Sequence, residues 1–411
     1  MHAEPPHRAD IADHDLLDDV ACAATWWAQQ RVWRVTSSHT GGGVIAALEE
    51  AVASRVASGA HALALPSATI ALAIALEAVG VEPGSAIGVP ALDWSAAAGL
   101  TRALSIAAVP LPVSPDTGLL DTGWLAHVPA LTEGLAAVVA VHLHGLTCDV
   151  PVLRNACPGL PIVEDAAQAW AACYPDGEPV GSAADACAFS FGAAKAPSAG
   201  ELGCLVTRTP RLHQAAVALT QHPTRQLLAG IAAPRYDRPM ARVAPAAALL
   251  GAYVINRHAE QVPALRRAGA AIATRLRDAG LAVMTDPAIH APGVIAVQAA
   301  PDKVMFRLRG IVPGPDIAVA SVDRAELRVH ARAEGQTRGD FSGAVTVVTL
   351  ADHSRPCLGV LSPASGYGLL KGGGATAAET GSQLVRAASP RDQGQPGHAL
   401  RRLQKPTIQN S

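Results

Sequence analysis

Two carboxylates and one lysine are the residues of this chain whose types and spacing most directly suggest chemistry. Glu164 and Asp165 stand at the end of the apolar run 160–163. A second apolar run, 186–191, leads to Lys195, a single lysine among Gly, Ala and Ser residues. An acid at the end of one buried strand and a lysine just past another suit pyridoxal 5'-phosphate. This cofactor needs a carboxylate to keep its pyridine nitrogen protonated and an amine to form a Schiff base.

Each of these residues also has an ordinary structural explanation. An aspartate at the carboxyl end of a parallel strand is often a helix N-cap or a loop residue. A lysine after Gly-Ala-Ala is often a solvated surface charge. Neither residue decides between the two explanations when it is taken alone.

Four stretches of sequence together resemble a known protein family. In chain order they are PSATIAL, VPALDWSAA, VEDAAQA and AFSFGAAKAPSAGELG. They resemble the DegT/DnrJ/EryC1/StrS family, which are fold-type I pyridoxal-phosphate aminotransferases acting mostly on nucleotide-linked keto-sugars. The resemblance runs from about residue 42 to about residue 250 and is faint beyond that point.

The resemblance implies a role for each matching residue. Lys195 holds the cofactor as a Schiff base and, once freed, acts as the general base. Asp165 keeps the pyridine nitrogen protonated, so that the ring works as an electron sink. Gln168 lies near the ring oxygen, and Trp94 stacks on the ring. The cofactor phosphate is held by Ala68, Thr69 and Ser190, the first two through backbone N–H groups at a helix start.

Some of these matches have a simpler explanation when they are considered in isolation. Residues 67–69 would be an ordinary N-cap, and Trp94 would fill the core. Alanine at position 68 replaces the glycine of the family, which is a mild change because the phosphate contact is made by the backbone.

Two positions depart from the family pattern. Where the family has an Asn and an Arg before its long linking helix, this chain has Asp237 and Pro239. In the family, the Asn of a partner subunit reaches the phosphate. An aspartate there would repel the phosphate by about 1 kcal/mol or more if partly buried. Either Arg235 or Arg238 compensates for this charge, or cofactor binding is weaker.

Apolar runs that alternate with helical stretches predict a mainly parallel central sheet covered by helices on both faces. Helices are expected over 44–57, over 253–281 as a long linking helix, and over 322–335. With the resemblance, the fold class is α/β, a fold-type I transferase with a small C-terminal α+β domain. The predicted divisions are an N-terminal arm (1–40), a large cofactor-binding domain (41–252), the linking helix and small domain (253–353), and an irregular or partly disordered tail (354–411).

Composition and charge exclude several classes of protein. Half of the 411 residues are hydrophobic and 16% are charged, so a large core is possible and global disorder is not expected. The net charge of −2 argues against a broad attraction to nucleic acid or membrane. The N-terminus has no apolar signal segment, and no run reaches the roughly 20 apolar residues of a membrane span. We therefore expect a soluble, cytoplasmic protein.

Cysteine and histidine spacing predicts no metal centre. The seven cysteines are odd in number and have no CxxC spacing, so neither a disulfide framework nor a zinc site is expected. His142 and His144 lack a third ligand, and we interpret them as pocket or core histidines.

The sequence therefore predicts an aminotransferase. It would move an amino group from an amino acid, Glu or Gln by the resemblance, to a keto-sugar, nucleotide-linked, or to a cyclitol ketone, in a biosynthetic pathway. A homodimer with shared active sites is expected, and Trp26, Trp27 and Trp33 either cap the core or meet the partner subunit. Two alternatives remain: a degenerate, non-catalytic relative that acts as a binding or regulatory subunit, and a sugar dehydratase. Relatives that dehydrate sugars carry histidine in place of Lys195, so the lysine favours amino transfer.

Overall fold

The computed structural model describes residues 9–30, 37–92, 96–114, 116–193, 195–238, 240–278, 280–298, 317–323, 326–331 and 345–350. By its internal contacts the chain forms two units, Met1–Pro356 and Cys357–Ser411. Every feature below belongs to the first unit. The predicted tail, Trp33, Trp94, Pro239 and the side chain of Trp27 lie outside the described residues.

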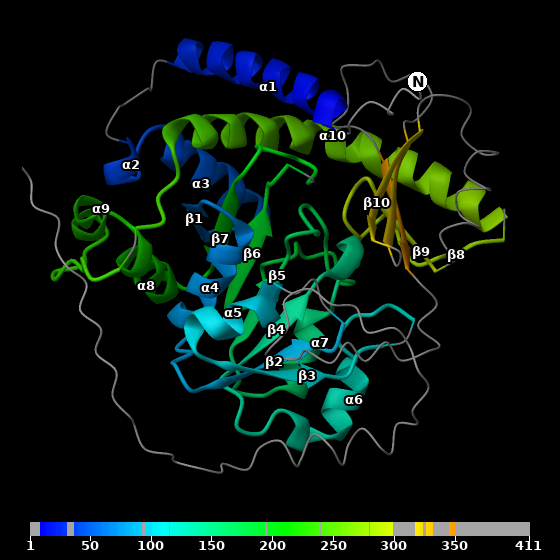
Figure 1. Ribbon diagram of the computed structural model, residues 1–411, viewed down its shortest axis with the longest axis horizontal. Helices are drawn as coiled ribbons and strands as arrows, with labels where there is room; N and C mark the ends of the chain where they lie inside the picture. Colours follow the sequence, from blue (N-terminus) through cyan, green and yellow to red (C-terminus); the bar gives the residue numbers. More distant parts are fainter. Residues whose placement is uncertain are drawn as a thin grey trace, which may run out of the picture. The chain divides into compact units, whose positions relative to one another are not determined.

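A mixed sheet of seven strands forms the core of the first unit, in the order β1-β7-β6-β5-β4-β2-β3 (Figure 1). The neighbouring strands from β6 to β3 are all parallel, whereas β7 is antiparallel to both β6 and β1. β4 and β5 are buried along their whole length, as expected of strands covered on both faces. The prediction of a mainly parallel sheet is confirmed. The strands are β1 (His61–Leu65), β2 (Ala86–Pro90), β3 (Ala107–Leu111), β4 (Ala137–Val141), β5 (Ile162–Asp165), β6 (Ala186–Ser190) and β7 (Gly203–Thr207).

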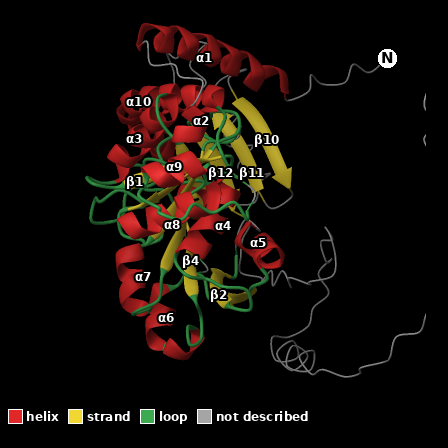
Figure 2. Cartoon of the chain, turned by 90° about the vertical axis from the view of Figure 1, so that its left-hand side faces the viewer, coloured by secondary structure: helices red, strands yellow, loops and turns green. Residues whose placement is uncertain are grey.

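Helices cover both faces of this sheet (Figure 2), and each face has its own apolar cluster. One cluster contains side chains of α3 (Val44–Val56), α6 (Thr122–His127), α7 (Val150–Ala156) and α10 (Pro245–Asp278). The other contains side chains of α4 (Ala68–Ala78), α5 (Ala96–Leu104) and α8 (Pro210–Thr220). The predicted helix over 44–57 is confirmed as α3. The predicted linking helix is confirmed as α10, although it begins earlier, at Pro245.

Helix α1 (Ala9–Gln30) lies along α10 (Figure 1). The ring of Trp26 packs on that of Tyr253, with centroids 6.5 Å apart, and Asp19 pairs with Arg257 at 2.5 Å. Trp26 therefore packs against the core, as the core-cap interpretation predicts. None of the described helices combines the length and the hydropathy that crossing a bilayer requires.

A second sheet, of five strands, follows in the order β10-β11-β12-β9-β8. The predicted helix over 322–335 is wrong in its described part, because two antiparallel strands occupy it. Leu327, Val329 and Ala331 recur every second residue, and this strand period outweighs the helix-favouring Ala, Arg and Glu content of the segment. The strands are β8 (Ala282–Val283), β9 (Val294–Gln298), β10 (Ile317–Asp323), β11 (Glu326–Ala331) and β12 (Val345–Leu350).

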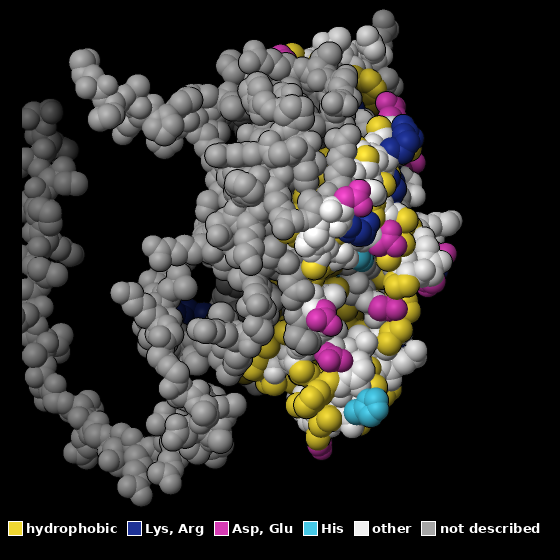
Figure 3. All heavy atoms as spheres, turned by 90° about the vertical axis from the view of Figure 1, so that its right-hand side faces the viewer, with side chains coloured by type: hydrophobic (Ala, Val, Ile, Leu, Met, Phe, Trp, Pro, Cys, Tyr) yellow, Lys and Arg dark blue, Asp and Glu magenta, His cyan; other side chains and the backbone are white. Residues whose placement is uncertain are grey.

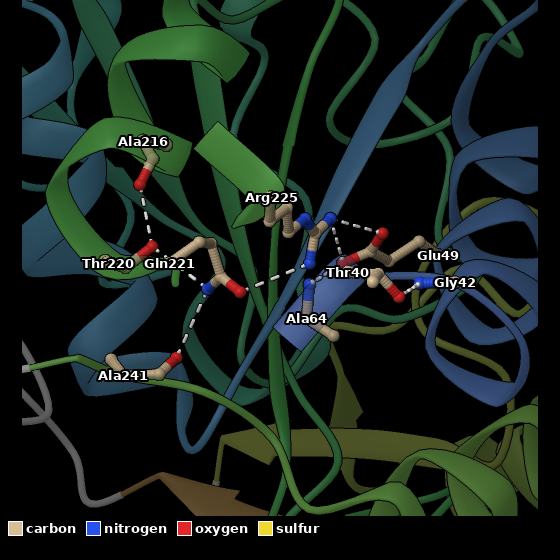
Figure 4. Close-up of polar contacts among 9 residues, drawn as sticks. All are labelled: Thr40, Gly42, Glu49, Ala64, Ala216, Thr220, Gln221, Arg225 and Ala241. Atoms are coloured by element: carbon tan, nitrogen blue, oxygen red, sulfur yellow. Dashed lines mark hydrogen bonds and ion pairs between the residues drawn. The ribbon is translucent and has the colours of Figure 1, made fainter. Parts of the chain in front are cut away.

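A buried ion pair joins α3 to the edge strand β1 and to α9 (Pro223–Leu228), as Figure 4 shows. Arg225 Nη2 donates to both oxygens of Glu49, at 2.9 and 2.7 Å, and Nη1 donates to Gln221 at 3.3 Å. Glu49 Oε1 also accepts the N–H of Ala64 at 2.8 Å. Because β1 is an edge strand, a free N–H there would be a pairing site for another chain. Gly41, with φ +71°, lies so close that an added Cβ would be 2.5 Å from Arg225 Nε.

Replacing Arg225 by Met should destabilise the protein by about 3–5 kcal/mol, because Glu49 is then left buried without its cation. Urea unfolding of the cofactor-free protein measures this loss. The double variant Glu49→Gln, Arg225→Met should lose less, since glutamine keeps an acceptor for Ala64 but carries no charge. An equal loss in the single and the double variant would show that the charge of Glu49 is not the cause.

Candidate active site

Asp165 and Ser190 end two neighbouring parallel strands and face the same side of the sheet. Side chains alternate along a strand, and Val163 and Ala188, two residues before them, both lie in the apolar cluster beneath α4. In the β5–β6 register, Asp165 is opposite Ala188. Glu164 therefore projects to the opposite face. The sheet thus brings Asp165 and Ser190 together on the side where α4 begins.

The start of α4 supplies backbone donors to this face. Ser67 is the N-cap, and its Oγ accepts the N–H of Ile70 at 3.3 Å. Ala68 and Thr69 are the first two residues of the helix, where N–H groups have no acceptor within the helix. Such N–H groups, together with the helix dipole, form an anion-binding site. Ala68 and Thr69 lie at this helix start, and their contact with a phosphate stays a prediction.

Gly203 allows this helix start to approach the sheet, and the sequence analysis missed it. It opens β7 and pairs with Ser190 across the β6–β7 ladder. A Cβ at Gly203 would lie 2.2 Å from the carbonyl carbon of Ser67 and 2.4 Å from the nitrogen of Ala68. Any side chain at this position would push the helix start away from the sheet beside Ser190. A glycine inside a strand pattern is a signal of close backbone approach that could have identified it.

Lys195 lies in the connection between β6 and β7. The N–H of Lys195 donates to Gly192 O at 2.9 Å, and the N–H of Ala199 donates to Phe191 O at 2.8 Å, so the connection folds back on the end of β6. The Lys195 side chain is half-buried. Its ammonium group is close enough to Asp165 to lower the pKa of that carboxyl. The charge of Lys195 thus acts on the carboxyl group of Asp165, and a site that both residues share stays a prediction.

Burial dominates the electrostatics of Asp165, whose side chain is only 8% exposed. Desolvation raises the pKa of this carboxyl. The N–H of Ala167, which donates to Oδ1 at 3.0 Å, acts in the opposite direction, as do Lys195 and His142, but the pKa remains above its ordinary value of 3.8. A cation brought against a carboxylate in this position would stabilise it.

Gln168 and His142 lie in the segments that flank the end of β5. Gln168 follows the strand end in a turn, and its Oε1 accepts the N–H of His144 at 2.8 Å. His142 and His144 are both buried, which confirms the prediction that they are pocket or core histidines. Within the described residues, no group of three His, Cys, Asp or Glu side chains could hold a metal ion.

Asp237 is exposed, unlike the residues above. Arg235 donates to it from Nε at 3.1 Å and from Nη2 at 2.8 Å, and this pairing lowers the pKa of the Asp237 carboxyl. Arg238 instead pairs with Glu77 on α4. Of the two arginines expected to compensate for Asp237, the structure therefore pairs Arg235 with it.

The mainly parallel sheet with its lysine connection is the fold of the sugar aminotransferases. The solved structure of DesI in the presence of its TDP-sugar product is 30% identical and covers 72% of this chain and 74% of that chain, with a TM-score of 0.56. More particularly, this chain belongs to the DegT/DnrJ/EryC1/StrS aminotransferase family, whose sequence model matches residues 28–295. The resemblance found in the sequence is confirmed.

Two curated relatives match a shorter part of the chain. Protein MosB of Rhizobium meliloti is 35% identical over 179 residues, which are 43% of this chain and 34% of that protein. The L-glutamine:2-deoxy-scyllo-inosose aminotransferase of Streptomyces paromomycinus is 39% identical over 152 residues, which are 36% of this chain and 35% of that protein. The chain thus spans about a third of the length of these relatives.

Asp165→Asn should stabilise the cofactor-free protein at pH 8. A carboxyl with a raised pKa in the folded state is destabilising once it ionises, and this penalty grows as the pH rises from the unfolded pKa through the folded pKa. Asparagine can still accept the N–H of Ala167 but carries no charge. Urea unfolding should show that the variant gains more free energy of unfolding, relative to the parent, at pH 8 than at pH 5. A gain of the same size at both pH values would contradict the assigned cause.

Proposed function

We propose that this protein is a pyridoxal-phosphate-dependent aminotransferase that moves an amino group from Glu or Gln to a keto-sugar or a cyclitol ketone. The observation that carries the proposal is the buried carboxyl group of Asp165, whose pKa the charge of Lys195 lowers. Membership in the aminotransferase family supports it. We propose the site residues Lys195, Asp165, Gln168, Ser190 and those of the α4 start on this basis, together with Trp94.

The donors and acceptors on this face fit the cofactor. Its phosphate is a dianion, and the N–H groups of Ala68 and Thr69 with the hydroxyl of Ser190 can donate to it. Because Gly203 has no Cβ, the Ser67–Ala68 peptide can lie directly against β7, beside Ser190. A protonated pyridine nitrogen would supply a further cation that stabilises the buried carboxylate of Asp165. The aldehyde requires an amine, and Lys195 provides one.

The bound cofactor would supply an electron sink for the carbon from which the amino group leaves. The protein residues hold and move protons around that sink. Asp165 would hold the protonated ring nitrogen, because a buried carboxylate is stabilised by a cation. Lys195 would carry the cofactor and, with its amine free, would serve as the base that accepts and gives back a proton during amino transfer. Gln168 would donate to the ring oxygen, and the start of α4 would hold the phosphate.

The relatives suggest both classes of amino acceptor. The Streptomyces paromomycinus relative is named as an L-glutamine:2-deoxy-scyllo-inosose aminotransferase, and the DesI structure was solved with its TDP-sugar product. For this chain we propose an acceptor ketone on a six-membered polyol, either a cyclitol or a nucleotide-linked sugar. On the face drawn in Figure 3, acidic and basic side chains of the described surface are interspersed, so charge alone favours no polyanionic macromolecule as partner. We also propose a cytoplasmic location, since the six described cysteines are free thiols.

Lys195→Ala should abolish the visible absorbance band of the bound cofactor and all turnover. The free energy of unfolding of the cofactor-free protein should change by less than about 1 kcal/mol, because a half-buried lysine in a connection packs little. Borohydride reduction and peptide mapping of the parent identify the lysine that carries the cofactor. The chain has four lysines, and an adduct on Lys303, Lys371 or Lys405 would overturn the assignment.

The same purified protein separates the alternative functions. A visible band that is lost on adding Gln or Glu and returns with a ketone supports amino transfer. A protein that takes up no cofactor, and remains colourless, would instead be the degenerate, non-catalytic relative. Conversion of a sugar without loss of an amino group from a donor would identify a dehydratase.

We further propose a homodimer in which Asp237, together with Arg235 of the same chain, reaches the active site of the neighbouring subunit. Several exposed apolar side chains lie on α9 and in the segment that carries Asp237, which suits a subunit interface. They are Leu227, Leu228, Tyr236 and Met240.

Leu228→Asp should weaken this dimer by at least about tenfold in its dissociation constant, because it places a charge inside an apolar interface. Sedimentation equilibrium measures the constant. Trp124→Asp is the control, since Trp124 is also exposed, 56% against 70% for Leu228, but lies on α6. If both variants change the dissociation constant equally, or if neither changes it, an interface at α9 is excluded.

A hybrid dimer tests whether the sites are shared. One subunit carries Lys195→Ala, and the other carries Arg235→Ala with Arg238→Ala. If the arginines act on the neighbouring site, one site of the hybrid has both lesions and one has neither, and about half of the parental activity returns. No recovery would mean that each subunit completes its own site.

A further inference from the structure

The turn that follows β4 fixes the orientation of the Gln168 amide. The N–H of His144 donates to Gln168 Oε1 at 2.8 Å, and an amide oxygen rather than an NH₂ group must face an N–H donor. The NH₂ group of Gln168 is thereby left to donate elsewhere. We propose that this turn, held in place by His142, fixes the Gln168 amide so that it donates a hydrogen bond to the ring oxygen of the cofactor. His142 is then a positioning residue, an inference that rests on the proposed function.

The turn itself is confined on two sides. The short helix η2 (Leu143–Gly145) contains two residues with left-handed backbone, His144 at φ +57° and Gly145 at φ +77°. A Cβ on Gly145 would lie 2.8 Å from the Cβ of Ala291 and 3.2 Å from the carbonyl oxygen of Gln168. The N–H of Ala291 donates to Gly145 O at 3.0 Å. The turn therefore touches the backbone of Gln168 as well as its side chain, and little room remains for it to move.

His142 connects this turn to the strand that carries Asp165. Its N–H donates to the carbonyl oxygen of Asp165 at 3.0 Å. Its Nδ1 accepts the N–H of Cys148 at 3.0 Å, so in the neutral ring the proton is on Nε2. That Nε2 contacts Oε1 of Glu164 at 3.2 Å, with both side chains completely buried. One ring thus joins both ends of the segment 142–148 to β5.

Glu164 is fixed from the other side by Tyr174. The phenol of Tyr174 donates to the same Oε1 that His142 contacts, and the N–H of Gly181 donates to the phenol oxygen at 3.0 Å. Burial and the nearby Glu164 both raise the pKa of Tyr174, so the phenol keeps the proton that it donates. Because Glu164 and Asp165 are adjacent in β5, this network holds the strand from the face opposite the cofactor site.

The donated hydrogen bond has a measurable effect on the bound cofactor. It would stabilise negative charge on the ring oxygen. This stabilisation would be largest when the nitrogen of the Schiff base with Lys195 has lost its proton. The donor therefore lowers the pH at which the visible absorbance of the bound cofactor titrates. Loss of the donor, or its displacement, should raise that pH midpoint.

Three variants of the full-length, cofactor-loaded protein test the proposal by absorbance titration. Gln168→Glu keeps an acceptor for the N–H of His144 but has no NH₂ group, so the midpoint should rise by about one pH unit. His142→Gln can keep the contact with Glu164 but loses the acceptor for Cys148, which frees the turn, and its midpoint should also rise. His142→Asn keeps that acceptor and loses the contact with Glu164, so its midpoint should rise by no more than half as much.

The outcomes distinguish this inference from the proposed function. A parent protein without a visible band would overturn the proposed function, and the inference with it. A parent with a normal band, but a Gln168→Glu midpoint equal to that of the parent, overturns only the donor assignment. Equal midpoints for the parent and His142→Gln overturn the role of His142. If His142→Gln does not fold, Gly145→Ala replaces it, since its Cβ would displace the turn against Gln168; here too a parental midpoint contradicts the proposal.

Discussion

The buried carboxyl group of Asp165 is the constraint on which the rest of the site depends. Removing a carboxylate from water is costly, and the structure offsets only part of that cost with one backbone N–H and the charge of Lys195. Its position requires β5 to end at this residue between two parallel neighbours, with α4 beginning on the same face. A bound cation would offset the remaining cost of burying this carboxylate, whereas without a bound cation that cost remains.

The sequence predicts the central sheet well because its strands are short apolar runs bounded by turns. β4 and β5 could be identified in this way, and so could the ends of β5 and β6, where Asp165 and Ser190 stand. The segment around Leu327 was predicted incorrectly because its composition favours a helix while its period is that of a strand. Periodicity is the better guide when the two disagree, since it reports which side chains share a face.

Other features could not be predicted because they depend on the close approach of distant segments. Gly203 matters only because the start of α4 lies against it, 136 positions earlier at Ser67 (203 − 67). The bonds between His142 and Glu164, and between His144 and Gln168, likewise join segments whose proximity the parallel sheet creates. The pairing of Arg235 with Asp237 is different, because the two are nearly adjacent and the compensation could be anticipated.

The pairing of β1 with β7 also has a consequence for how the chain folds. Leu65 is opposite Gly203, so the start of α4 and the connection that carries Lys195 meet only when these two strands join. Pairings between residues so far apart in sequence close late and slowly, because a long loop must be ordered first. During synthesis, a chain that has not yet emerged past β7 cannot assemble both halves of the site. A cofactor that binds only where both halves meet would stabilise the closed sheet by mass action.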